Sequence, residues 1–153
     1  MVTLSKSAGV PGKKGDRTLA HSVVEIEGIG PQYGKKLHEA GIRSTEQLLE
    51  ACKTPKARKA LATKTEISEQ LILRWANHAD LFRIKGVARQ FAELLEAAGV
   101  DTVKELKSRR AEALSAKMRE VNETRKLSKV APSIPVVKKW IDQAKTLQSK
   151  LSY

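Results

Sequence analysis

Apolar side chains recur every three or four residues along most of the chain, which is the spacing of one face of an α-helix. A first stripe follows Pro31 and is made of Tyr33, Leu37 and Ala40. Two longer stripes have the same spacing: Leu71, Trp75, Ala79 and Phe82, then Val137, Trp140, Ala144, Leu147 and Leu151. No run of alternating Val, Ile and Thr indicates a strand. The pattern predicts an all-α protein in which both tryptophans lie in the core.

Polar residues and glycines mark where these helices begin and end. Pro31 suits a first helical turn, where its missing N–H is not needed. Gly41 stands after the first stripe, where a left-handed residue ends a helix. Side chains that can accept a hydrogen bond from a first-turn amide precede the other helices. They are Ser44 or Thr45, Ser68, Thr102 and, beside Pro135, Ser133.

The chain contains an internal repeat at an offset of 58 residues. Segment 26–33 aligns with 84–91 without a gap, and 40–42 aligns with 98–100. The match resumes at Trp75 and Trp140 after an insertion of about seven residues in the second copy. Repeats of this size are supersecondary units that bury their apolar faces against each other. We therefore expect a first repeat over 23–82 and a second over 83–153, sharing one core.

Composition adds a strong positive charge to this picture. The formal net charge is +12, with apolar residues at 41% and aromatic residues at 4%. Residues 1–22, rich in Ser, Gly and Lys, are expected to be a flexible basic arm. A charge of this sign attracts polyanions such as DNA or RNA, although lysines can also merely keep helix faces soluble. Cys52 is the only cysteine and no segment resembles a signal peptide or membrane helix, so we expect a soluble cytoplasmic protein, with nucleoid association as an alternative.

The segment from Gly28 to Leu37 resembles the helix-hairpin-helix motif, in which an apolar-Gly-apolar-Gly corner opens a helix. Glycines let the chain turn tightly and bring backbone N–H groups close to a phosphate. The helix that follows adds the positive end of its dipole. The apolar residues between the glycine positions, Ile29 and Val87, are expected to point into the core.

Between about Val23 and Leu147 the chain resembles an uncharacterised bacterial family, a domain of unknown function with two such motifs in tandem. Better-known relatives with this motif include DNA ligases, repair nucleases and branch-migration proteins, in which paired hairpins grip duplex DNA through its phosphates. The resemblance therefore implies nucleic-acid binding without sequence readout, with duplex DNA favoured and RNA an alternative. Carried over to this chain, it implies phosphate contacts at Gly28, Ile29, Gly30, Lys35, Lys36, Lys85, Gly86, Val87, Ala88 and Arg89.

Some residues depart from that pattern and keep a second hypothesis open. Ala88 replaces the second glycine, Glu93 stands opposite Lys35, and Glu25 and Glu27 flank the first hairpin. Such corners can also serve only in packing, so a protein-interaction or scaffold domain in a larger assembly is the alternative. We find no catalytic constellation, no metal site and no cofactor motif, because the three histidines are scattered and the glycines follow no strand. An enzyme is not expected, and neither is a membrane partner.

Overall fold

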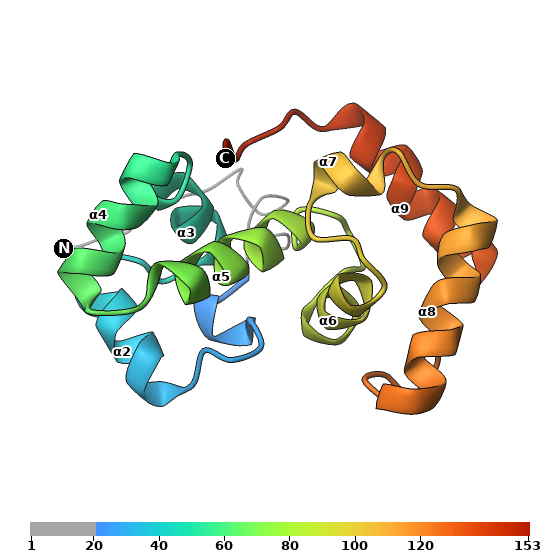
Figure 1. Ribbon diagram of the computed structural model, residues 1–153, viewed down its shortest axis with the longest axis horizontal. Helices are drawn as coiled ribbons and strands as arrows, with labels where there is room; N and C mark the ends of the chain where they lie inside the picture. Colours follow the sequence, from blue (N-terminus) through green and yellow to red (C-terminus); the bar gives the residue numbers. More distant parts are fainter. Residues whose placement is uncertain (1–20) are drawn as a thin grey trace, which may run out of the picture.

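Helices form the regular structure of this computed structural model, which describes residues 21–153 (Figure 1). A 3-10 turn, η1 (Val23–Glu25), precedes eight α-helices. They are α2 (Pro31–Glu39), α3 (Thr45–Ala51), α4 (Pro55–Thr65), α5 (Glu69–Leu81), α6 (Arg89–Ala97), α7 (Val103–Leu106), α8 (Ala111–Arg125) and α9 (Ile134–Thr146). Within that range there is no strand, only a single bridge between Ser22 and Ser44. The all-α prediction is confirmed.

The helices gather into two halves that α5 connects (Figure 1). In the first half, α5 packs against α3 and α4. In the second, α6 packs on α8, and α9 packs on α7 and α8. The halves meet where α5 contacts α6. Of the expected basic arm, residues 1–20 lie outside the described part, whereas Ser22 is held by its bridge to Ser44.

Most helix starts follow the capping residues that the sequence indicates, but Ser133 precedes α9 without accepting a hydrogen bond from its first turn. The Ser44 hydroxyl accepts a hydrogen bond from the Gln47 amide at 3.0 Å, and Thr102 accepts one from Glu105 at 3.2 Å. Ser68 caps α5 in the same way, by accepting from Leu71. Each such cap satisfies an amide that the helix itself cannot pair, typically worth about 1 kcal/mol.

The core is continuous and contains both tryptophans. Trp75 is fully buried and Trp140 is 3% exposed, as their place on apolar stripes predicts. Ile29 and Val87 are also buried, which confirms that the middle residues of the two corners point inward. The stripes themselves are less uniform, because Leu71 and Leu147 are only partly buried against the core.

The end of the chain differs from the expected long helix. Helix α9 ends at Thr146, and Leu147 is already extended, so Leu151 is buried from a non-helical tail. This tail returns to the first half, where the Ser152 amide donates to the Lys53 carbonyl at 2.8 Å. The buried guanidinium of Arg58 donates to the carbonyls of Cys52 and Ser152, both at 2.8 Å. The amide and the carbonyl of Ser152 therefore form hydrogen bonds with the first half and not within a helix.

Candidate nucleic-acid interface

Two backbone corners with the same geometry precede α2 and α6. The first corner is residues 26–30, and the second corner is residues 84–88. The Ile29 amide donates to the Ile26 carbonyl at 3.1 Å, and the Val87 amide donates to Ile84 at 3.0 Å. Gly28 and Gly86 lie at φ +96° and +97°, a region that residues with a Cβ rarely adopt. The same chain path is therefore built twice, 58 residues apart.

A tryptophan lies behind each glycine. A Cβ placed on Gly28 would be 3.4 Å from Nε1 of Trp75, and one on Gly86 would be 3.3 Å from Nε1 of Trp140. Each indole also meets an aromatic ring from the helix that follows its corner. Tyr33 lies 5.0 Å from Trp75 and Phe91 lies 5.2 Å from Trp140, between ring centroids. These contacts fix each corner against its own half of the core.

The corners face outward at their glycines. Gly28, Gly30 and Gly86 are exposed, and Ala88 is half-buried. Within residues 21–153, the amides of these four residues have no hydrogen-bond acceptor. The amides of Ile29 and Val87 are different, because both are used inside the corner. Contrary to prediction, Ile29 and Val87 therefore anchor the corners and offer no free donor to an anion.

The two helices that follow the corners lack side-chain caps. Gly30 and Ala88 occupy the N-cap positions of α2 and α6, and neither has a side-chain oxygen. Helices α3, α4, α5 and α7 begin with a Ser or Thr that accepts an amide hydrogen bond, whereas α8 and α9 also lack a side-chain cap. The first-turn amides and dipole ends of α2 and α6 are thus left for another acceptor.

Lysines stand beside both corners. Lys35 is exposed and Lys36 is half-buried on α2, and Lys85 is exposed next to Gly86. Gln143 of α9 holds the backbone of Lys85, since its side chain accepts from the Lys85 amide at 2.9 Å and donates to the Lys85 carbonyl at 3.3 Å. Sequence reasoning missed Gln143. The repeat aligns it with His78 through the two tryptophans, and that alignment is the signal that could have found it.

Arg89 is used inside the fold rather than left free. Its guanidinium donates to the carbonyls of Val24 and Glu25, both at 2.9 Å, and lies 3.9 Å from the Glu27 carboxylate. These bonds join the start of α6 to η1, and so connect the two halves. The Arg89 side chain is half exposed, but its guanidinium already has acceptors within the protein. The prediction that Arg89 contacts a phosphate is therefore not supported.

The acidic residues at the first corner are partly compensated. Burial alone would raise the pKa of Glu25, but hydrogen bonds from His21 and the Ser22 amide, with the charges of His21 and Arg89, lower it. Glu93, opposite Lys35 in the repeat, has a raised pKa because of its burial and the nearby charge of Glu27. The charge of Glu25 is therefore compensated by its partners, whereas the raised pKa of Glu93 indicates no such compensation.

Comparison with known proteins gives one match. A family model described as "Domain of unknown function (DUF4332)" matches residues 27–147. The chain belongs to the DUF4332 family. The matched region of this DUF4332 protein begins in the first corner and ends just after α9, so it contains both glycine–tryptophan pairs. No curated protein and no solved structure was found to match the chain. None of the described helices is long and apolar enough to cross a lipid bilayer.

Proposed function

We propose that this protein binds nucleic acid, duplex DNA in the first place, through two helix-hairpin-helix motifs that contact phosphates without reading bases. One observation carries the proposal: at the uncapped starts of α2 and α6, two glycine corners of the same geometry carry amides that have no acceptor within residues 21–153. Backbone N–H groups at a helix N-terminus are suited to bind phosphate oxygens.

Charge supports this assignment. The net charge of +12 attracts a polyanion over long range, and Lys35, Lys36 and Lys85 provide cations beside the corners. The revised contact set is Gly28, Gly30, Gly86 and Ala88 through backbone amides, and the three lysines through their side chains. Ile29, Val87 and Arg89 support the site from behind.

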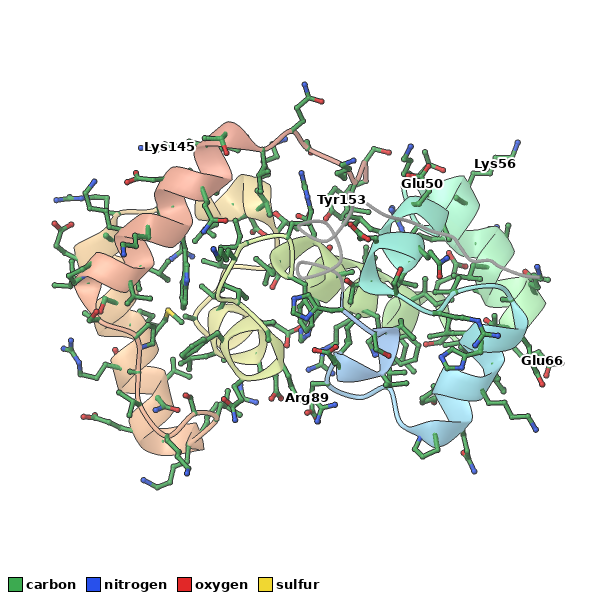
Figure 2. The ribbon with its side chains drawn as sticks, turned by 180° about the vertical axis from the view of Figure 1, so that it is seen from behind. Glu50, Lys56, Glu66, Arg89, Lys145 and Tyr153 are labelled. Carbon is green, nitrogen blue, oxygen red and sulfur yellow. The ribbon has the colours of Figure 1, made fainter. Side chains whose placement is uncertain are left out.

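Fluorescence anisotropy with a labelled duplex at several salt concentrations tests the proposal. Replacing Lys35 and Lys36 together with Gln removes two phosphate partners, so the slope of log K against log salt becomes shallower by about 2. The matched control replaces Lys145 and Lys150 with Gln. Figure 2 shows Lys145 near the upper edge of the view and Arg89 near the lower edge, and Lys150 belongs to the tail after α9. This pair therefore removes the same charge outside the proposed contact set.

Equal effects of the two pairs would remove the corners from the mechanism and leave only general charge attraction. Affinity that depends strongly on base sequence would contradict phosphate-only contact. A wild-type protein that binds neither duplex DNA nor RNA at low salt would overturn the proposal. It would favour the scaffold hypothesis, for which a protein partner that survives nuclease treatment in a pull-down is the corresponding observation.

A further inference from the structure

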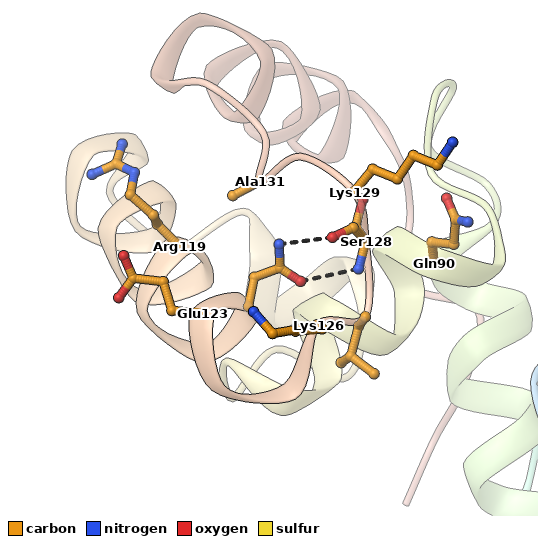
Figure 3. A pocket seen from close by; sticks show the side chains of 9 residues that line it. Gln90, Arg119, Glu123, Lys126, Ser128, Lys129 and Ala131 are labelled. Atoms are coloured by element: carbon orange, nitrogen blue, oxygen red, sulfur yellow. Dashed lines mark hydrogen bonds between the residues drawn. The ribbon is translucent and has the colours of Figure 1, made fainter.

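A cavity of about 600 Å³ lies between the start of α6 and the end of α8 (Figure 3). It is outside the set of residues that the sequence singled out. Nine residues line it: Gln90, Arg119, Asn122, Glu123, Lys126, Leu127, Ser128, Lys129 and Ala131. Its size is within the range of small-molecule sites, about 300–1,000 Å³.

The lining is mixed in polarity and net positive. Its charged side chains are three cations, Arg119, Lys126 and Lys129, and one acid, Glu123. None of the three cations forms an ion pair with another residue of the described range. This excess of unpaired positive charge favours an anionic ligand over a neutral one.

The loop that carries the lysines has a fixed backbone. Asn122 holds it from α8: its amide nitrogen donates to the Ser128 carbonyl at 2.9 Å, and its oxygen accepts from the Ser128 amide at 3.0 Å. Lys126 turns the chain out of α8 in a left-handed conformation, at φ +51°. The backbone between Lys126 and Lys129 is therefore preorganised, which reduces the entropy that a bound ligand would have to offset.

The cavity adjoins the second corner. Gln90 is the second residue of α6, two positions after Ala88, which is about 3 Å along a helix axis. Figure 3 shows Gln90 and Lys129 on one side of the cavity, with Arg119 and Glu123 on the other. Because the opening lies so close to Ala88, a strand held at Gly86 and Ala88 would bring a neighbouring phosphate group toward the cavity.

We propose that this cavity is a second phosphate site, in which Lys126, Lys129 and Arg119 bind a phosphate group next to the one at the second corner. This inference rests on the proposed function, because it takes the bound phosphate to belong to a nucleic-acid strand. A free phosphorylated small molecule offers the same chemistry, and the experiment separates the two sources.

The test follows backbone and side-chain amide signals by NMR. Wild-type protein is titrated at low salt with inorganic pyrophosphate and, separately, with a short DNA duplex. We expect both ligands to shift the signals of Gln90, Asn122 and Ser128. The variant with Lys126→Gln and Lys129→Gln should lose these shifts, and Arg119→Gln alone should weaken them. The variant with Lys145→Gln and Lys150→Gln is the matched control, and thermal unfolding confirms that each variant is folded.

The outcomes separate this inference from the proposed function. Shifts at the cavity with pyrophosphate, without any duplex binding, support the cavity as a phosphate site and contradict the proposed function. Duplex binding that moves the corner signals, with no shift at the cavity from either ligand, overturns the inference and leaves the proposed function standing. Shifts that persist unchanged in the Lys126 and Lys129 variant also overturn it.

Discussion

Arg74 of α5 and Glu96 of α6 form a two-pronged ion pair across the junction of the two halves. Arg74 Nε and Nη2 donate to the two carboxylate oxygens, each at 3.0 Å. The same carboxylate lies 3.2 Å from Nε2 of His78, a side chain only 1% exposed. In α6, Glu96 follows the corner that is proposed to bind phosphate, so this pair sets how the two corners are held relative to each other.

Glu96 gives the fold an acid-sensitive contact. Burial alone would raise its pKa, but the close contact with His78 and the hydrogen bonds from Arg74, with the charges of both residues, lower it to about 2. A carboxylate with a lowered pKa stabilises the folded state above its unfolded pKa, about 4.3, and this contribution is lost as the pH falls toward 2. We expect Glu96→Gln to lower the free energy of unfolding at pH 7 by about 1–3 kcal/mol. The difference in Tm from wild type should shrink between pH 5 and 2. A difference that stays constant over that range would contradict this role of the carboxylate.

Gly28→Ala should destabilise the protein through its backbone. The residue lies at φ +96°, but a Cβ there would be 3.4 Å from Trp75 Nε1, an ordinary contact distance. The expected cost is that of a left-handed conformation, about 1–2 kcal/mol. Gly41→Ala is the matched control, because Gly41 has φ +87° and no atom within 4 Å of its Cβ position. Similar decreases in the free energy of unfolding of the two variants, measured by chemical denaturation, would assign the cost to backbone strain. A much larger loss for Gly28→Ala would assign it to the tryptophan contact.

The two corners differ at the second glycine position, which makes them testable against each other. A Cβ built on Gly30 meets nothing within 4 Å, so its methyl group would point to solvent and to an approaching phosphate. Gly30→Ala should therefore lose about one phosphate hydrogen bond, worth about 1.5 kcal/mol or roughly tenfold in duplex affinity. Ala88→Gly is the matched comparison and should change duplex affinity little, because the Ala88 methyl group packs against the core and not toward the duplex. Anisotropy measures both, and unchanged affinity in Gly30→Ala would exclude close backbone approach at this position.

Arg58 connects the C-terminal tail to the first half. It is 6% exposed and donates to the carbonyls of Cys52 and Ser152, and its guanidinium carbon lies 5.4 Å from the centre of the Tyr153 ring. Arg58→Lys cannot supply both donors in this geometry. Losing one charged hydrogen bond should reduce the free energy of unfolding by about 1.5–3 kcal/mol.

Cys52 provides a local readout for the same variant. The thiol is fully buried, and burial raises its pKa to about 12, so it should not react with a thiol reagent at pH 8 in the folded wild type. In Arg58→Lys we expect faster labelling, because the tail opens more often. Labelling that is faster only in proportion to the loss of global stability would mean that the variant affects global unfolding and not the tail.

The sequence by itself determined the features that depend on neighbouring residues. Apolar spacing predicted α2, α5 and α9, although not α4 or α8. Ser44, Ser68 and Thr102 predicted the starts of α3, α5 and α7, and the repeat predicted that the environment of Trp75 recurs at Trp140. These features can be predicted from the sequence because a cap or a helical stripe involves residues only a few positions apart. The family match over 27–147 agrees with the resemblance to a domain of unknown function, and the two helix-hairpin-helix motifs stay a prediction.

Only the tertiary structure decided which groups at the candidate site are free and which are already used. Arg89 binds carbonyls 64 and 65 residues away, and Arg58 reaches Ser152, 94 residues along the chain. The cavity cations likewise meet Gln90 only because α6 packs on α8. The sequence does not show whether a charged side chain contacts solvent, a phosphate or a distant carbonyl. The choice among these partners is made by packing of the whole chain, which brings distant groups together and excludes water between them.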